Sequence, residues 1–302
     1  MIPEPVVSVV VPTVGRTELG RAVASALAQT HPVAEVLVVA DTTQPVELPA
    51  DHRVRLVRPP RRLGSSRARQ FGIDAAAGTV IALLDDDDEW LPEKLARQFA
   101  HVDAVVQQPD TPWIASCGVE AVGPDGSAIW PRRPIRPDES VPDYLFRFHS
   151  PRFGGATLQT STLCFPVELA RQVRWNDPAG AVHDDIRWLL DVRAALAGVA
   201  IVQLPDPLVR YHLTAGSQSR NSADRTTDYL AWGRRHLTDA PRRTRGDYFL
   251  TGPVAAAVAA GSPTGVLRAT GTGLRCGRPG PAALLYAAAG VPRAVRRGGW
   301  TR

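Results

Sequence analysis

The stretch TVIALLDDDDEW, residues 79–90, runs from apolar side chains straight into five successive carboxylates. Its first half is rich in aliphatic and β-branched residues, which predicts a buried strand over residues 79–85. Two carboxylates about 6 Å apart repel by roughly 3 kcal/mol at an effective dielectric constant of about 20. The acidic run, residues 85–89, therefore needs either counter-charges or raised pKa values.

Two interpretations of the acidic run follow from its chemistry. The segment 91–93, Leu-Pro-Glu, is typical of a helix start, so Asp88 and Glu89 can belong to a solvated turn that caps the next helix. The other interpretation is a divalent-cation site, because Mg²⁺ and Mn²⁺ prefer oxygen ligands and often bind one or two carboxylates together with phosphates. In an extended segment Asp85 and Asp87 point the same way, so one can reach a ligand and the other a metal.

Buried strands alternate with amphipathic helices before the acidic run. Strands are predicted over 6–12, 35–41 and 53–58, and helices over 17–29 and 65–78. Continuous apolar strands separated by helices are typical of a mostly parallel sheet with helices on both faces. We therefore predict an α/β fold of the Rossmann-like kind.

Polar or special residues follow three of these strands where they end. They are Pro12 with Thr13, Asp41, and the acidic run. Ligands of such sheets bind at the carboxyl ends of the strands, so this convergence predicts a nucleotide pocket. There is neither a GxGxxG motif after the first strand nor a Walker A loop, so phosphate would be held by a metal and by arginines.

The pattern loosens after residue 100. We predict a helix over 95–108 that continues from the acidic run, a hairpin over 113–130 that turns at 124–126, and a Pro-rich loop over the site at 131–142. We further predict a strand over 154–165, a helix over 184–198 that is closed by Gly198, and a strand leading into a loop over 206–220. From about residue 222 the chain is rich in Arg and Ala without clear strands. This predicts a domain over 1–220 and a mainly helical extension over 221–302.

Composition narrows the class of protein. The chain has 302 residues, 44% hydrophobic and 22% charged, with a net charge of +5, which is ordinary for a globular protein. Its three cysteines form no CxxC pair, which argues against a zinc site and a disulfide framework and favours a reducing, cytoplasmic setting. We expect no signal peptide and no spanning helix. Basic residues are not interleaved with aromatics in a nucleic-acid motif, so no nucleic acid partner is expected.

Four segments in a fixed order carry a resemblance to a known family. They are VVVPTVGR (9–16), SALAQTHPVAEVLVVAD (25–41), GSSRARQFGIDAAAGTVIALLDDDDEW (64–90) and HDDIRWLL (183–190). Together they resemble the family 2 glycosyltransferases of the GT-A fold over about residues 6–220. The resemblance implies a polysaccharide-biosynthesis enzyme that moves a hexosyl group from a nucleotide-diphosphate donor, a UDP-sugar being favoured. The acceptor would be a hydroxyl of a saccharide, a lipid-linked sugar or a small molecule.

The resemblance also implies roles for single residues on the donor side. Arg69 stands in ARQ where the family has ARN, near the diphosphate, while Ala40 replaces an acid that the family often has before Asp41. Asp85, Asp86 and Asp87 occupy the DxD motif, which implies Mn²⁺ or Mg²⁺ as cofactor. The implied contacts are Pro12, Thr13 and Arg16 with base and ribose, Asp41 with the base, Asp85 with ribose, Asp86 within the motif, and Asp87 with the metal.

On the acceptor side the family carries an acidic pair where this chain has Asp184 and Asp185. Asp185 would be the catalytic base, with Asp184 as the other candidate; alternatively both acids only cap a helix and complement its dipole. Some relatives use a His at the position of His212 as a further metal ligand, although a lone His is more often structural. Trp90 either stacks on a sugar or fills the core.

One base and one displacement imply inversion at the anomeric carbon, whereas a glycoside hydrolase needs two flanking carboxyl groups. Two rival functions stay open. A sugar nucleotidyltransferase usually has a Gly-rich loop and a catalytic Lys, but this chain has only Lys94; a non-catalytic binding or scaffold protein would show a broken motif.

The tail 254–302 combines apolar residues with Arg and Trp300, which suits peripheral contact with the inner face of a membrane or packing on the protein itself.

Overall fold

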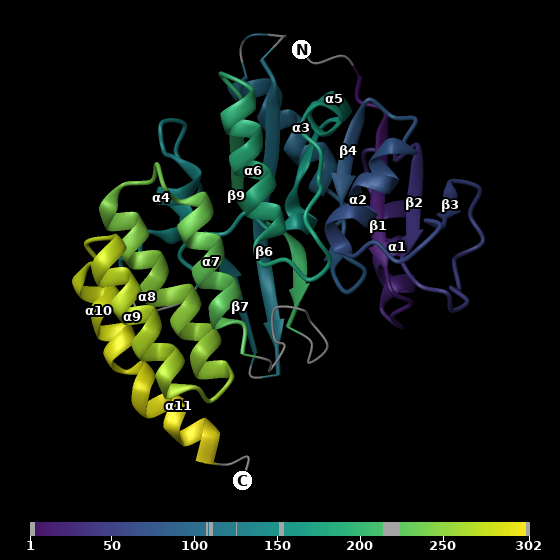
Figure 1. The fold of residues 1–302 in the computed structure, drawn as a ribbon. Helices are drawn as coiled ribbons and strands as arrows, with labels where there is room; N and C mark the ends of the chain where they lie inside the picture. The colour runs from purple at the N-terminus through teal and green to yellow at the C-terminus, as the bar shows by residue number, and fades with distance from the viewer. Residues whose placement is uncertain are drawn as a thin grey trace. The chain divides into compact units, whose positions relative to one another are not determined.

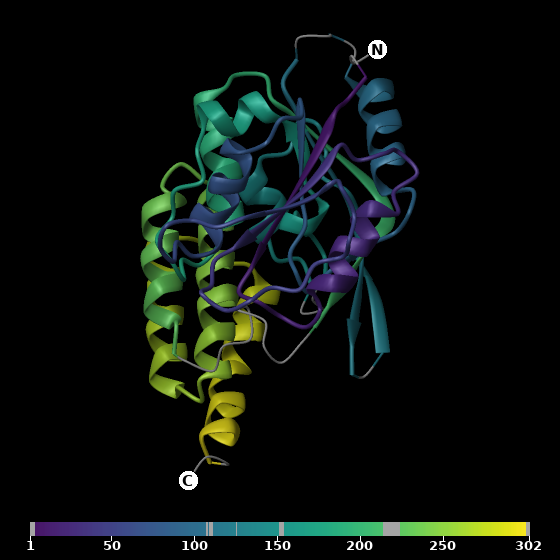
Figure 2. The ribbon, with the colours of Figure 1, turned by 90° about the vertical axis from the view of Figure 1, so that its right-hand side faces the viewer.

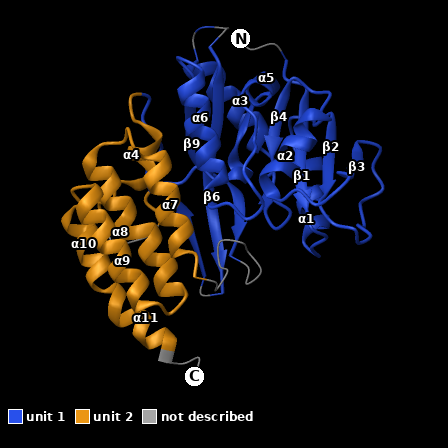
Figure 3. Cartoon of the chain, viewed as in Figure 1, with its two compact units in different colours: residues 1–137, 156–214 blue, residues 138–155, 215–302 orange. Residues whose placement is uncertain are grey.

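The computed structural model describes residues 4–106, 108, 111–124, 126–150, 154–213 and 224–299. The chain divides into two compact units (Figure 3). The first contains residues 1–137 and 156–214, and the second contains residues 138–155 and 215–302. The second unit is thus built from two separate segments, one of which interrupts the first unit.

The first unit is organised around four parallel strands. In the sheet, β1 (Val7–Thr13) lies between β2 (Glu35–Ala40) and β4 (Val80–Leu83), and β3 (Val54–Val57) lies outside β2. All of β2 and β4 and nearly all of β1 are buried, as expected for strands covered on both faces. The four strands predicted from residues 6–85 are therefore confirmed.

The rest of the sheet is mixed. Its strands are β5 (Glu89–Trp90), β6 (Trp113–Gly123), β7 (Gly126–Trp130), β8 (Cys164–Pro166) and β9 (Ala200–His212). The strand order in the described sheet is β3-β2-β1-β4-β8-β6-β9-β5, and β7 pairs with β6 as the predicted hairpin. β8 runs antiparallel to both β4 and β6, whereas β9 is parallel to β6.

Helices cover both faces of this sheet (Figures 1 and 2). On one face, α1 (Leu19–Leu27) and α3 (Lys94–Val105) share a hydrophobic core with side chains of β1, β2 and β6. On the other face, α2 (Ser65–Asp74) packs on β1 and β2, and α5 (Val167–Gln172) packs on α2. The predicted α/β architecture is confirmed, with the sheet mixed beyond β4.

One predicted element is wrong. The segment 154–165 is not a strand along its length, because it contains a short 3₁₀ helix at Thr160–Thr162 and enters β8 only at Cys164. The three 3₁₀ residues carry hydroxyls and are all buried. Hydroxyl side chains that bond to neighbouring backbone compete with a strand ladder, and Thr162 Oγ1 does so by donating to the carbonyl oxygen of Gln159.

The described part of the second unit is helical, as predicted. It contains α4 (Val141–Phe146), α7 (Thr226–His236), α8 (Arg242–Ala259), α9 (Pro263–Cys276), α10 (Pro281–Ala288) and α11 (Gly290–Gly299). Asp247 in α8 is fully buried and accepts hydrogen bonds from the backbone N–H groups of Phe148 and Gly280. This carboxylate therefore ties segment 138–155 to the C-terminal helices. Among the described helices, none combines the length and the apolar character needed to cross a membrane.

The contact between α2 and the sheet depends on Gly72. A Cβ atom there would lie 2.5 Å from Cγ1 of Val10 and 2.8 Å from Cγ2 of Val39. We predict that Gly72→Ala lowers the free energy of unfolding by about 1–3 kcal/mol, because α2 or the two strands must shift. The matched control is Gly20→Ala in α1, where no atom lies within 4 Å of the new Cβ. Urea unfolding that showed equal midpoints for both variants would contradict this account of the packing.

Candidate active site

The three strand ends predicted to converge do meet. The backbone N–H of Asp41, which follows β2, donates to the carbonyl oxygen of Thr13 at the end of β1 at 2.8 Å. The Thr13 hydroxyl donates in turn to Oδ2 of Asp86, beyond β4, at 2.6 Å. One chain of hydrogen bonds thus links the carboxyl ends of β2, β1 and β4.

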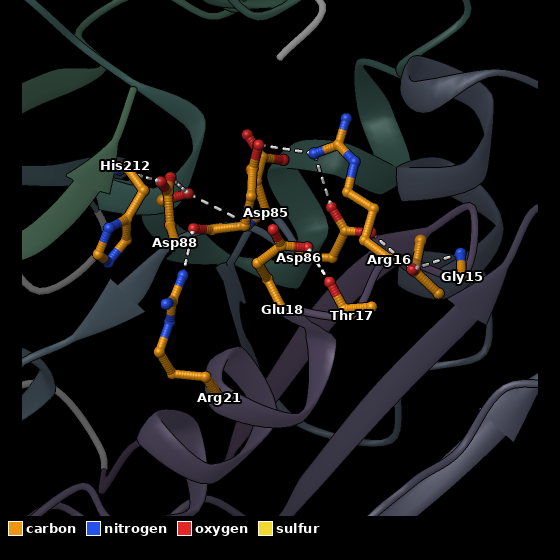
Figure 4. A network of polar contacts seen from close by, with 12 residues as sticks. Gly15, Arg16, Thr17, Glu18, Arg21, Asp85, Asp86, Asp88 and His212 are labelled. Atoms are coloured by element: carbon orange, nitrogen blue, oxygen red, sulfur yellow. Dashed lines mark hydrogen bonds and ion pairs between the residues drawn. The ribbon is translucent and has the colours of Figure 1, made fainter. Parts of the chain in front are cut away.

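Arginines distant in sequence neutralise the acidic run. Arg16 Nη1 lies 2.6 Å from Asp87 Oδ2 and 3.1 Å from Asp86 Oδ1 (Figure 4). Arg69 Nη2 lies 2.9 Å from Asp85 Oδ1. Charge-assisted bonds of this length are among the stronger hydrogen bonds in proteins. They supply the counter-charges that the crowded carboxylates require.

The arginines do not remove the electrostatic cost completely. Burial raises the pKa of Asp86 to about 6, although Thr13 and Arg16 oppose the shift. Burial and then the nearby Asp85 raise the pKa of Asp87, and both raise that of Asp88 well above its ordinary value. The negative form of these carboxylates is therefore electrostatically unfavourable. A cation bound at this edge would stabilise that form, which favours binding of the cation.

Arg69 connects the acidic run to α6 (Asp184–Ala195). Its side chain is 5% exposed and lies 5.4 Å from the ring centroid of Trp175. While Nη2 contacts Asp85, Nη1 donates to Asp184 Oδ2 at 2.8 Å. One guanidinium thus holds together two acids about a hundred residues apart in sequence, and Ser65 adds a second hydrogen bond to Asp184.

The two acids at the start of α6 have different surroundings. Asp184 is paired with Arg69, whereas Asp185 has no ion pair among the described residues; its Oδ1 accepts the backbone N–H of Ile186 at 2.7 Å. Burial and the neighbouring Asp184 raise the pKa of Asp185 to about 7, and Arg69 opposes the shift. The residue before them, His183, has φ 55°, a left-handed conformation that a non-glycine residue rarely adopts. Backbone strain of this kind is often found at functional sites.

His212, at the end of β9, lies beside the acidic run. Its backbone N–H donates to Asp88 Oδ1 at 3.3 Å, and its Nε2 is 3.8 Å from Glu89 Oε2. Nε2 is buried and makes no hydrogen bond to the described residues. Burial and then Arg21 lower the pKa of His212, which favours the neutral imidazole that can bind a metal.

The carboxylate oxygens at this edge fit a hard divalent cation such as Mg²⁺ or Mn²⁺, and the unbonded imidazole nitrogen of His212 is a further, softer donor. Within the described ranges, however, no three His, Cys, Asp or Glu side chains are arranged as a ready metal cage. A cation here would therefore take few ligands from the protein and the others from a phosphate-bearing ligand.

Comparison with known proteins shows which family this chain resembles. Residues 8–141, a little under half of the chain, match the family model described as glycosyl transferase family 2. The chain thus contains a region similar to glycosyl transferase family 2. It is 30% identical over 182 residues to the amylovoran biosynthesis glycosyltransferase AmsB of Erwinia amylovora, covering 60% of this chain and 57% of that relative. It is 40% identical over 114 residues to the succinoglycan biosynthesis protein ExoO of Rhizobium meliloti (strain 1021), covering 36% and 31%.

Solved structures confirm the GT-A fold of this chain. The complex of S. aureus TarS 1-349 with UDP-GlcNAc has a TM-score of 0.54 at 14% identity, over 96% of this chain and 89% of that one. The mannosyltransferase PcManGT of Pyrobaculum calidifontis, in complex with GDP-Man and Mn²⁺, also has a TM-score of 0.54, at 18% identity over 99% and 88%. In sequence, the chain spans between about a third and three fifths of the curated relatives AmsB and ExoO.

The structure restricts two of the predicted contacts. Asp41 accepts backbone N–H groups from Leu63 at 2.6 Å and Gly64 at 2.8 Å, so both its oxygens already hold the loop before α2. Trp90 is 2% exposed and belongs to the hydrophobic core, with Lys94 Nζ 4.1 Å from its ring centroid. The structure thus gives Trp90 a packing role rather than an open face for a sugar. Pro12 remains partly exposed at the end of β1.

Sequence reasoning missed Ser161. The Ser161 hydroxyl accepts the backbone N–H of Asp85 at 3.1 Å and also bonds to the carboxylate of Asp88. The carbonyl oxygen of Ser161 accepts Nε1–H of Trp90 at 2.8 Å. The only signal in the sequence is the run of hydroxyls at 160–162, which lies in the segment predicted as a strand.

Asp185 allows a test of its electrostatics through stability. Because its pKa of about 7 lies above the ordinary carboxyl value, the folded chain binds this proton more tightly than the unfolded chain does. The resulting stabilisation is complete below a pH of about 4 and is lost as the pH rises through 7. We predict that Asp185→Asn raises the free energy of unfolding at pH 8 by on the order of 2 kcal/mol, and that the gain shrinks towards pH 4.

Denaturant unfolding at pH 4, 6 and 8 measures this dependence. The matched control is Asp191→Asn, which removes a carboxylate that is 38% exposed from the same helix and so frees no buried charge. A gain for Asp185→Asn that stayed constant across the pH range would show that the substitution acts through packing instead.

Proposed function

We propose that this chain is an inverting glycosyltransferase that moves a sugar from a nucleotide-diphosphate donor, with a UDP-sugar favoured, to an acceptor hydroxyl in polysaccharide biosynthesis. The observation that carries the proposal is the link made by Arg69. Arg69 contacts both Asp85 of the acidic run and Asp184 at the start of α6. The residue after Asp184 is Asp185, a carboxylate whose pKa is near neutral. The proposal assigns a proton acceptor and a diphosphate-binding edge to this one site.

The donor would bind across the ends of β1, β2 and β4. Thr13, Arg16 and Asp85 have polar atoms at this edge, while Asp41 supports the loop before α2 against which a base would lie. Asp87, with His212 as a further ligand, would hold Mn²⁺ or Mg²⁺, which would stabilise negative charge on the leaving diphosphate. Arg16 would then exchange its contact with Asp87 for one with the donor, and Arg69 would supply positive charge beside the diphosphate.

Asp185 would act as the base. It accepts the proton of the acceptor hydroxyl while the oxygen forms a bond to the anomeric carbon, and the bond from that carbon to the diphosphate breaks with its electron pair on the leaving oxygen. A single displacement inverts the configuration at the anomeric carbon. A base with a pKa near the working pH is effective in such a transfer, and the pKa of Asp185 of about 7 meets that requirement. Asp184 is less suited because Arg69 occupies it.

The rival functions gain less support. A sugar nucleotidyltransferase would need a catalytic lysine, but Lys94, the single lysine of the chain, is fully buried and donates to Gln98. A scaffold protein would have no need to keep a partly buried carboxylate at raised pKa beside an acidic motif. The relatives AmsB and ExoO are named for amylovoran and succinoglycan biosynthesis, which favours a saccharide or lipid-linked acceptor.

Nucleotide binding tests the donor site. We predict that UDP binds with Mn²⁺ and at least tenfold more weakly without it, and that Asp87→Ala abolishes the metal dependence in isothermal titration calorimetry. GDP is titrated in parallel, because one structural neighbour holds UDP-GlcNAc and another GDP-Man. Asp228→Ala, at a carboxylate that is 58% exposed, is the matched control. Binding of GDP alone would change the donor and keep the site, whereas failure of both nucleotides would overturn the proposal.

Transfer kinetics test the base. We predict that Asp185→Asn lowers kcat by about 10²–10⁴ with little change in the affinity for the nucleotide, because only proton removal is lost. In the wild type, the rate should rise with pH to a plateau with a midpoint near 7, as Asp185 loses its proton. A larger loss in Asp184→Asn than in Asp185→Asn would assign the base to Asp184.

A further inference from the structure

The last part of the chain has a one-sided charge. Residues 248–302 contain no Asp, Glu or Lys but seven arginines, so their formal net charge is +7. Since the whole chain carries +5, residues 1–247 together carry −2. The positive charge of the protein is therefore concentrated in one segment, whose described helices are α9, α10, α11 and the larger part of α8. Such a segment attracts an anionic partner.

The same segment exposes large aliphatic side chains. Leu267 and Leu274 are 62% and 55% exposed on α9, and Leu285 is 70% exposed on α10. Seven residues separate Leu267 from Leu274, so they lie on one face of their helix, and each is followed directly by an arginine. Leu284 on α10 and Val295 on α11 are exposed as well. Because α11 packs against α9 and α10, these side chains belong to one helical cluster.

The contacts of the arginines divide them into two groups. Arg293 stabilises the helical cluster through contacts within it. Its guanidinium lies 4.5 Å from the ring centroid of Tyr286 and donates to the carbonyl oxygens of Tyr286 and Ala289. In contrast, the side chains of Arg278, Arg296 and Arg297 are exposed and make no ion pair or hydrogen bond with the described part of the chain. Three guanidinium groups thus remain available on the same helical segment that exposes the leucines.

We propose that helices α9, α10 and α11 form a surface that binds a bilayer containing anionic phospholipids. Leucine side chains enter the boundary between headgroups and acyl chains, and the arginines pair with phosphates there. The leucines distinguish this partner from a nucleic acid, whose backbone would engage the arginines but would gain nothing from exposed aliphatic groups. The proposal does not depend on the transfer reaction, because lipid binding is measured without donor or acceptor.

Vesicle co-sedimentation of the full chain tests the surface. We expect binding to vesicles of phosphatidylcholine with 30% phosphatidylglycerol, weakening with added salt, and little binding to phosphatidylcholine alone. Arg296→Gln with Arg297→Gln should reduce the affinity roughly 25-fold, at about fivefold for each arginine. Leu267→Ser with Leu274→Ser should reduce it roughly tenfold or more, because apolar burial is lost without any change in charge.

Two matched controls make the test specific to this surface. Arg61→Gln with Arg62→Gln removes the same charge from an exposed pair elsewhere, and Ile129→Ser removes a side chain that is 60% exposed on β7. Both should bind as the wild type does. Absence of binding to anionic vesicles, or losses equal to those of the controls, would overturn the proposal. The proposal would also be overturned if the leucine double variant bound vesicles normally and duplex DNA competed with the vesicles. The surface would then be a general polyanion site.

Discussion

The guanidinium of Arg69, buried between Asp85 and Asp184, is the contact on which the geometry of the site depends. An arginine with this little exposure is tolerated only when its charge is paired, and carboxylates this crowded are tolerated only when they are neutralised. The two requirements are met together, at 2.9 and 2.8 Å. Removing one partner of such a buried pair typically costs about 3–5 kcal/mol, because the other charge is left uncompensated. The end of β4 and the start of α6 are thereby held at a fixed separation.

This pairing also explains why two adjacent acids differ. Asp184 takes the arginine, and its negative charge disfavours a second negative charge at Asp185, which Arg69 only partly offsets. Burial adds to that effect, and the pKa of Asp185 rises to about 7. The acidic run divides in a similar way: Asp85 and Asp87 face arginines, while Asp88 lies inside and bonds to Ser161. Crowded carboxylates of one sequence motif thus acquire separate properties from their neighbours.

Much of the fold was predictable because local patterns and burial agree in the first hundred residues. Continuous runs of apolar residues mark β1, β2 and β4, because a parallel strand that is covered on both faces needs apolar side chains on both of them. The segment 154–165 was not predictable in this way, since its buried hydroxyls act on groups far along the chain. Trp90 illustrates the same limit: an aromatic beside acids suits a sugar site equally well, until Lys94 and Ser161 are seen to enclose it.

The sequence by itself determined the resemblance to the family 2 glycosyltransferases, the strands that carry polar ends, and the concentration of arginines after residue 248, because these depend on residue type and spacing along one chain. Only the tertiary structure decided which arginine neutralises which acid, that Asp185 and not Asp184 is left without an ion pair among the described residues, and that Trp90 is core. The physical reason is that pairing energies and desolvation depend on distance and burial. Arg69, Asp85 and Asp184 become neighbours only when the sheet and α6 have come together.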